Sequence, residues 1–129
     1  YAEMLSKKMK DAGVNVWLIN TGWSGGQYGV GRRMPLKYTR AMITAVLNGD
    51  LGSYSYEDYH IHSVFGVAQP RSCPGVPTGL LSPRSTWNDD EAYYKTAFKL
   101  SNAFRTNFKQ FEENASEEIQ RGGPQRYAH

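Results

Sequence analysis

The spacing of hydrophobic and polar residues predicts a helix, a strand, a loop and a second helix in the first 49 residues. Apolar positions in residues 1–12 follow helical spacing, and Gly13 is a natural helix end. The segment "VNVWLIN", residues 14–20, has an unbroken apolar run that predicts a strand buried on both faces. After a glycine-rich loop, Pro35 suits the first turn of a helix that "NG" at 48–49 ends. This order is typical of an α/β nucleotide-binding unit.

The second helix is expected to be amphipathic. Its apolar face is predicted to comprise Leu36, Thr39, Ile43, Val46 and Leu47, with Met42 beside them. Residues 50–88 follow a different pattern, because Pro70, Pro74, Pro77 and Pro83 exclude a long helix or a central strand. "HIHSVFGVA", residues 60–68, is expected to form at most one strand. We interpret the rest as an extended segment that wraps the surface of something larger.

A third helix is predicted to follow, with Asn88 as its N-cap and acidic residues in its first turn. The run "NDDE", residues 88–91, is therefore interpreted as helix capping rather than as acid–base chemistry. From Tyr93 to Phe111 apolar residues recur at steps of three or four, which predicts about five turns with an aromatic seam. The polar residues after Glu113, numbers 114–129, are expected to form a tail whose end frays.

Composition narrows the class of protein. With 129 residues, the chain is at most one ordinary domain or a piece of a larger one. The net charge of +3 suits a small anionic ligand but is too diffuse to indicate nucleic acid. The single cysteine, Cys73, excludes an internal disulfide and favours a reducing, cytoplasmic location. No apolar run approaches the ~20 residues that span a membrane, so no membrane partner is expected.

The loop "SGGQYGVGRR", residues 24–33, is the strongest candidate for binding chemistry. A glycine-rich loop before a helix can bring backbone N–H groups close to an anion. The spacing from Gly26 to Gly31 resembles a phosphate-binding P-loop, but Arg32 and Arg33 replace the lysine and the Ser/Thr of that motif. Two interpretations stay open at this point: an anion site that uses arginine forks, and a flexible connector with solvated arginines.

The histidines and the cysteine do not predict a metal centre. His60 and His62 would share a face of a strand, but no third ligand accompanies them, and His129 is the last residue. These histidines are expected to be solvated or structural, and Cys73 is expected to be a small packed residue. No pairing of a nucleophile with a base follows from local spacing, so no catalytic residue and no metal ligand is predicted in this chain.

Several motifs together resemble one enzyme family. These are "VNVWLINTGWSGGQYGVGRRMPLKYTRAMITAVLNG", "VFGVAQPRSCPGVPTGLLSPRSTW" and "FKLSNAFRTNFKQF". In this order and spacing they resemble the C-terminal end of ATP-dependent phosphoenolpyruvate carboxykinases over residues 1–113. The resemblance implies a mixed α/β fold in which 1–113 form a C-terminal segment of the nucleotide-binding lobe and 114–129 a polar tail.

The resemblance also implies a reaction and a binding site. That family converts oxaloacetate and ATP to phosphoenolpyruvate, CO₂ and ADP with Mg and Mn ions, whose ligands would lie outside this chain. Arg33, Met34 and Thr39 match the positions that contact ATP, with Met34 against the adenine. Pro35 stands where the family usually has a serine that caps the helix. A chain without the phosphate cradle and the metal ligands is expected to be inactive alone, and a homo-oligomer is possible.

Two other classes of function stay open on the residues alone. One is a free-standing module that binds a nucleotide or another anion without catalysis. The other is a basic interaction domain. The length of the resemblance favours a segment of the carboxykinase over both.

Overall fold

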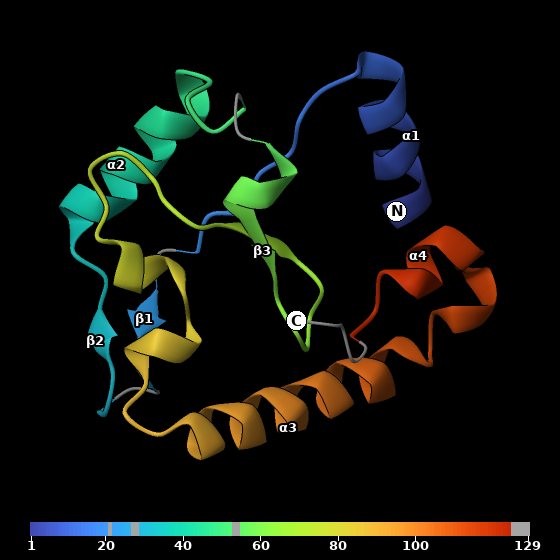
Figure 1. Cartoon of the computed structure of the whole chain (residues 1–129). Helices are drawn as coiled ribbons and strands as arrows, with labels where there is room; N and C mark the ends of the chain where they lie inside the picture. The colour runs from blue at the N-terminus through green and yellow to red at the C-terminus, as the bar shows by residue number, and fades with distance from the viewer. Residues whose placement is uncertain (21, 27–28, 53–54, 125–129) are drawn as a thin grey trace.

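A computed structural model describes residues 1–20, 22–26, 29–52 and 55–124. Four short strands form two small two-stranded sheets, and helices precede, separate and follow these sheets along the chain (Figure 1). The arrangement is a mixed α/β fold, as the sequence predicts at that coarse level. The elements are α1 (Ala2–Ala12), β1 (Trp23–Ser24), β2 (Arg32–Arg33), α2 (Leu36–Leu47), η1 (Tyr56–Asp58), β3 (Tyr59–Ile61), β4 (Ala68–Pro70), η2 (Thr78–Leu81), η3 (Arg84–Thr86), α3 (Asp90–Phe108), η4 (Glu112–Asn114) and α4 (Glu117–Arg121).

The ends of the first two helices confirm the sequence prediction. Gly13 ends α1 in the left-handed conformation with φ 62°, and its N–H donates to carbonyl groups of the last turn. Pro35 precedes α2 as its N-cap, and Asn48 follows as the C-cap. Gly49, with φ 75°, then turns the chain away from the helix axis. Proline and glycine therefore set these boundaries through backbone geometry.

The buried face of α2 differs from the prediction. Thr39 and Ala45 are the buried residues of this helix, while Leu36 and Leu47 are 62% and 80% exposed. The residues of α2 that face the core cluster are Tyr38, Ala41, Met42, Ala45 and Val46. The predicted apolar face is therefore correct only at Thr39, which is buried, and at Val46, which packs against the core together with Met42 beside the predicted face.

The strand predicted at residues 14–20 does not form. Strands β1 and β2 pair with each other and β3 pairs with β4, and among the described residues none pairs with this segment. Val16 is 55% exposed and Leu18 is 89% exposed. An extended apolar segment needs a hydrogen-bonding neighbour on each side to become a central strand, and the described part of the chain supplies none.

Residues 59–70 form a hairpin rather than one strand. His60 lies opposite Gln69 in an antiparallel pair, and Pro70 occupies the end of β4, where a missing N–H is tolerated. Gly66, with φ 69°, makes the turn and donates its N–H to the carbonyl of His62 at 2.9 Å. The remaining prolines allow only the short 3₁₀ helices η2 and η3, so the prediction of no long helix is confirmed.

Helix α3 begins one residue later than predicted. The carboxylate of Asp89, rather than Asn88, accepts the N–H of Glu91 at 2.9 Å and caps the helix. Of the predicted aromatic seam, Tyr93 and Ala97 are buried, with Ser101 on the same face. Further along, the seam is exposed, for example 50% at Phe104. The amphipathic pattern is therefore buried only in the first three turns.

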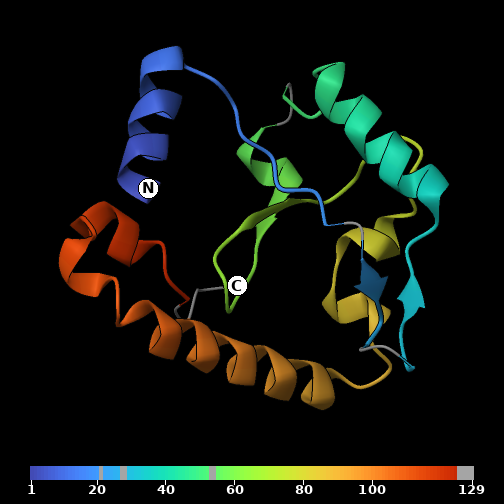
Figure 2. The same cartoon turned by 180° about the vertical axis from the view of Figure 1, so that it is seen from behind.

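The segment after Glu113 contains the short helix α4. The hydroxyl of Ser116 caps α4 by accepting the N–H of Ile119. Helix α4 lies beside α1 in both views (Figures 1 and 2), where Lys10 and Glu118 form a salt bridge of 2.9 Å. The expected fraying of 125–129 falls outside the described residues.

The core is divided between two places. One cluster contains the buried Ala45, Leu51, Cys73 and Val76, packed against α2 and η2. The other lies between α3 and the β3–β4 turn, where Val64, Tyr93 and Ala97 are buried. In the described part of the chain, no helix is both long enough and apolar enough to cross a bilayer.

Candidate functional site

The glycine-rich segment folds into a tight antiparallel hairpin. Trp23 pairs with Arg33, and Ser24 pairs with Arg32. Gly26 has φ 145°, a conformation that L-residues with a side chain rarely adopt. A Cβ on Gly31 would collide with backbone carbonyl oxygens across the hairpin. The glycines therefore bring the two arms of the hairpin together and fix where Arg33 emerges.

The hairpin leads directly into helix α2. The N–H of Met34 donates to the carbonyl of Gly22 at 3.1 Å and extends the pairing of the two arms by one bond. Pro35 then caps the helix without any side-chain hydrogen bond. Proline fixes φ near −65° and can therefore set the direction of the first turn without a serine cap.

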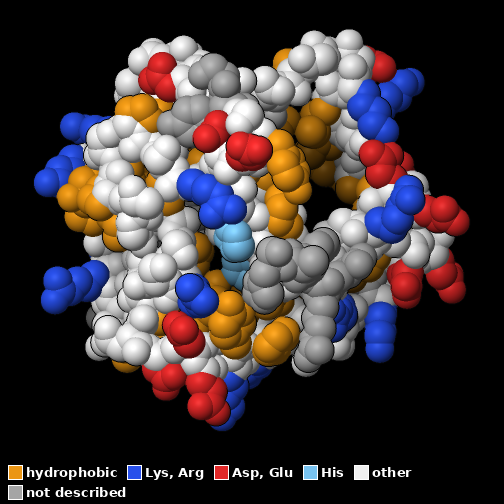
Figure 3. Space-filling view, viewed as in Figure 1, with side chains coloured by type: hydrophobic (Ala, Val, Ile, Leu, Met, Phe, Trp, Pro, Cys, Tyr) orange, Lys and Arg blue, Asp and Glu red, His pale blue; other side chains and the backbone are white. Residues whose placement is uncertain are grey.

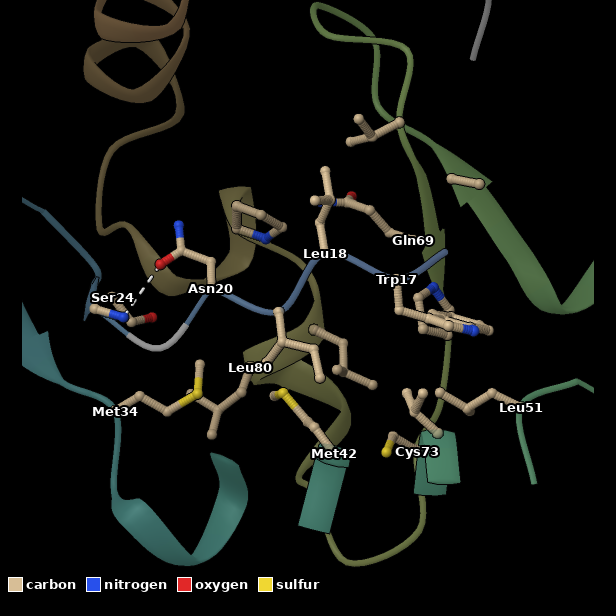
Figure 4. Close-up of a pocket in the computed structure, with 18 of the residues that line it drawn as sticks. Trp17, Leu18, Asn20, Ser24, Met34, Met42, Leu51, Gln69, Cys73 and Leu80 are labelled. Atoms are coloured by element: carbon tan, nitrogen blue, oxygen red, sulfur yellow. Dashed lines mark hydrogen bonds between the residues drawn. The ribbon is translucent and has the colours of Figure 1, made fainter. Parts of the chain in front are cut away.

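A cavity of about 920 Å³ lies beside this hairpin. Its walls come from residues 15–20, the hairpin, α2 and the segment 67–87. Met34, Met42 and Leu80 extend toward its middle, and Leu18 lies across from them (Figure 4). The side chain of Asn20 accepts the N–H of Gly22 at 3.1 Å and holds one corner of the opening. Its size and its apolar side chains are those of a cleft for a sizeable, partly apolar ligand.

The structure does not bring the three predicted ATP-contacting residues together in one wall. Met34 lines the cavity. Arg33 is exposed on β2, directly opposite Trp23, which also lines the cavity. Thr39 is 8% exposed in the first turns of α2 and does not line the cavity, and among the described residues its hydroxyl has no hydrogen-bond partner. Their shared contact with ATP therefore stays a prediction.

Cys73 is a packed residue of the cavity wall, as the sequence predicts. Its side chain is buried in the cluster beneath α2. Burial raises the pKa of the thiol, and the charge of Asp50 raises it further. A thiol held in its protonated form is a poor nucleophile, so Cys73 contributes shape and apolar surface here.

A buried His–Tyr pair is a feature that sequence reasoning missed. The Nε2 atom of His62 lies 2.6 Å from the hydroxyl of Tyr93, and Nδ1 of His62 accepts the N–H groups of Val64 and Phe65 at 3.1 and 3.2 Å. Burial lowers the pKa of His62, with a smaller contribution from His60. The partners are 31 positions apart in the sequence, which gives no local spacing signal, so only the fold reveals the pair.

The described residues do not fit a metal centre. Among them, no three His, Cys, Asp or Glu side chains gather closely enough to hold a metal ion. His62 has a structural role in the turn between β3 and β4, and His129 lies outside the described residues. We therefore assign no metal ligand and no metal-dependent step to this part of the chain.

Comparison with known proteins identifies the family. The sequence profile of phosphoenolpyruvate carboxykinase matches residues 1–79. A protein of Flavobacterium johnsoniae named phosphoenolpyruvate carboxykinase (ATP) is 60% identical over 124 residues. Proteins with the same name from Christiangramia forsetii and Fusobacterium nucleatum are 59% identical over 124 residues and 49% identical over 126. In each comparison 96% of this chain is covered, but only 23% of the relative.

The chain is thus part of an α/β protein in which a glycine hairpin adjoins an apolar cleft. It belongs to the phosphoenolpyruvate carboxykinase family. It spans 23% of the length of the curated relatives it matches. Because 124 of the 129 residues are covered in the first two comparisons, the likeness extends past Glu113 into the segment that contains α4.

Proposed function

We propose that this chain is a C-terminal segment of an ATP-dependent phosphoenolpyruvate carboxykinase and supplies contacts to the adenine nucleotide. The enzyme would convert oxaloacetate and ATP to phosphoenolpyruvate, CO₂ and ADP in the cytoplasm, with residues 1–113 in the nucleotide-binding lobe and 114–129 as a polar extension. The observation that carries the proposal is the hairpin. It places Met34 in the wall of an apolar cleft and leaves Arg33 exposed beside it.

Arg33 supplies charge and a flat cationic surface in this proposal. Its strand position is fixed by pairing with Trp23, and among the described residues its guanidinium forms no salt bridge. A guanidinium can stack on a purine ring or donate paired hydrogen bonds to phosphate oxygens. Because it is exposed and unpaired, it binds a nucleotide without first breaking a contact within the described residues.

Met34 supplies the apolar contact. Its thioether side chain points into the cleft together with Met42 (Figure 4). Methionine is unbranched and polarisable, and it therefore adapts to the face of an aromatic ring. The hydrogen bond from Met34 to Gly22 holds the backbone in place, so the flexible side chain projects from a fixed point toward the ligand.

Thr39 supplies a hydroxyl that can accept and donate hydrogen bonds. Thr39 is a largely buried residue of α2, yet among the described residues its hydroxyl bonds to no protein group. Because no buried side-chain oxygen of the described residues lacks a partner, the Thr39 hydroxyl is itself accessible and can take a ligand atom as its partner. In the proposal this partner is a polar atom of the nucleotide, bound next to the ring that Met34 contacts.

Phosphoryl transfer itself would depend on groups outside this chain. Such reactions are accelerated mainly by divalent ions and by donors that cradle the phosphates. In the proposed enzyme, Mg and Mn would neutralise phosphate charge, and residues beyond this chain would hold them and oxaloacetate. The part described here binds and orients the nucleotide. We therefore expect no turnover from the 129-residue chain alone, which a coupled decarboxylation assay would detect.

The proposal is tested by replacing Arg33 in the full-length enzyme. Losing a charge-assisted hydrogen bond costs about 1.5–3 kcal/mol, so Arg33→Ala should raise the KM for ATP about tenfold or more. The KM for oxaloacetate should not change. Lys99→Ala is the matched control, because it removes one charge from the exposed surface of α3. Unchanged ATP kinetics in Arg33→Ala would refute the nucleotide role.

Met34 offers a second, independent test. Met34→Ala removes most of the apolar surface that this side chain contributes to the cleft wall and should weaken ATP binding several-fold. Met34→Leu conserves volume and should restore most of the affinity. Equal affinities for the two variants would mean that the ring does not contact this side chain. ATP binding without phosphoenolpyruvate formation by the full-length protein would instead favour a nucleotide-binding module without catalysis.

A further inference from the structure

A second, smaller cavity lies against the β3–β4 hairpin. It has a volume of about 310 Å³ and is enclosed by the hairpin, the segment from η2 to η3 and the first turns of α3. In the space-filling view, histidine side chains lie in a hollow near the middle of the face, with lysine or arginine side chains beside them (Figure 3). The cavity is small for a nucleotide and lies at the lower end of the range for ligand pockets.

The charged side chains that line this cavity are positive. Arg71 and Arg84 line it, and no lining residue among those described is acidic. Neither arginine forms a salt bridge within the described part of the chain. Nε of Arg71 donates to the carbonyl of Glu57 at 3.2 Å, which fixes the guanidinium and leaves its terminal nitrogens available. The nearby carboxylate of Asp58 is occupied by the backbone N–H of Ser55 at 2.7 Å.

The hydrogen-bond pattern of His62 leaves a buried donor at this cavity. Nδ1 of His62 accepts two backbone N–H groups, so its proton must be on Nε2. Nε2 therefore donates to the hydroxyl oxygen of Tyr93, and the hydroxyl hydrogen of Tyr93 remains for another acceptor. Tyr93 is only 9% exposed, and the described residues supply no acceptor for that hydrogen.

The hydrogen bonds of His62 described above require the neutral form of its ring. Burial lowers the pKa of His62, and the nearby His60 lowers it further. At neutral pH the ring thus stays uncharged and holds the tautomer that the turn requires. The Tyr93 hydroxyl, with its pKa raised by burial, also stays protonated. A ligand at this position therefore meets an O–H donor rather than a phenolate.

From this geometry we infer that the cavity binds a small oxyanion, such as a phosphate monoester or a compact dicarboxylate. Arg71 and Arg84 would bind its charge, and Tyr93 would donate a hydrogen bond from the cavity floor. Guanidinium forks match both phosphate and carboxylate oxygens. This site goes beyond the proposed ATP contacts, because Arg71, Arg84 and Tyr93 line only the smaller cavity.

Calorimetric titration of the full-length protein tests the site. The probes are inorganic phosphate and succinate at low ionic strength, with the protein saturated with ADP. The full-length protein should bind one probe per chain at this site. Arg84→Gln should abolish this binding or lower its affinity about tenfold, because a charge-assisted hydrogen bond is removed. Tyr93→Phe should weaken the same binding event. Lys99→Gln is the control for charge, since it lies on the exposed surface of α3.

A site-specific signal supports the calorimetry. In protein with ¹⁵N-labelled histidine rings, the probe should shift the His62 resonances, identified by their loss in His62→Asn. Binding of phosphate alone identifies a phosphate monoester as the ligand class, and binding of succinate alone identifies a dicarboxylate. Equal probe binding by wild type and Arg84→Gln, or no shift at His62, overturns the inference. If Tyr93→Phe fails to fold, the result for Arg84→Gln decides.

Discussion

The turn that His62 organises offers a sharp test of the structure. Replacing His62 with leucine keeps a similar apolar volume but removes the acceptor for the N–H groups of Val64 and Phe65. A buried donor left without a partner costs about 1–3 kcal/mol. Val64 is 2% exposed, so its N–H would be left fully buried without a partner, whereas the N–H of Phe65 is only partly buried. We therefore expect His62→Leu to destabilise the folded chain by about 2–4 kcal/mol.

Asparagine is the matched control. Its side-chain oxygen can accept N–H groups two and three residues ahead, as asparagine does in turns. His62→Asn should therefore retain the bonds to Val64 and Phe65 and lose only the contact with Tyr93. That loss should cost about 1 kcal/mol. The two variants thus separate the role of Nδ1 from that of Nε2.

Amide hydrogen exchange at Val64 and Phe65 is the appropriate assay, because it reports local opening in a protein of any size. A loss of about 2 kcal/mol should speed exchange by roughly thirtyfold in His62→Leu. His62→Asn should change it only several-fold. If both variants exchange at the same rate, Nδ1 does not hold the turn, and the tautomer assigned to His62 is wrong.

Three further outcomes follow from the structure. Because burial and His60 lower the pKa of His62 below 6.5, the unfolded chain binds a proton more readily, and stability measured by urea unfolding should fall as the pH drops below 6.5. Gly31→Ala should destabilise the hairpin by at least about 1 kcal/mol in the same assay, since the new methyl group meets the carbonyl of Gly26. Cys73 should react with iodoacetamide slowly at pH 8 and rapidly once urea unfolds the chain, because it is buried and its pKa is raised.

Local signals in the sequence predicted the helices well. Periodicity and glycine or proline boundaries place α1 and α2 to within a residue or two, and the acidic run before α3 acts as a cap as expected. These features depend on neighbours within four residues along the chain. They need no knowledge of the rest of the fold.

Features that depend on distant partners were predicted less well. The apolar run 14–20 has strand composition, but strand formation requires a neighbouring strand, and the described residues provide none. Leu36 and Leu47 follow helical spacing yet are exposed, because the core packs against a different face of α2 that contains Ala41, Met42, Ala45 and Val46. Apolar spacing identifies a candidate stripe, and only packing decides which stripe is buried.

The two candidate sites also differ in how far the sequence could predict them. Arg33, Met34 and Thr39 were assigned from the family resemblance, and of the three the structure places only Met34 in the cleft wall. The second cavity has no local motif, since Arg71, Arg84 and Tyr93 come from three separate segments. Convergence of donors from distant segments is a property of the fold, which explains why sequence reasoning assigned no role to these residues.

The reaction itself is the most direct test of the central proposal. The full-length protein should form phosphoenolpyruvate, CO₂ and ADP from oxaloacetate and ATP in equal amounts, in the presence of Mg and Mn. The 129-residue chain assayed in parallel should form none. No ATP-dependent phosphoenolpyruvate from the full-length protein, or turnover by the isolated chain, would contradict the account.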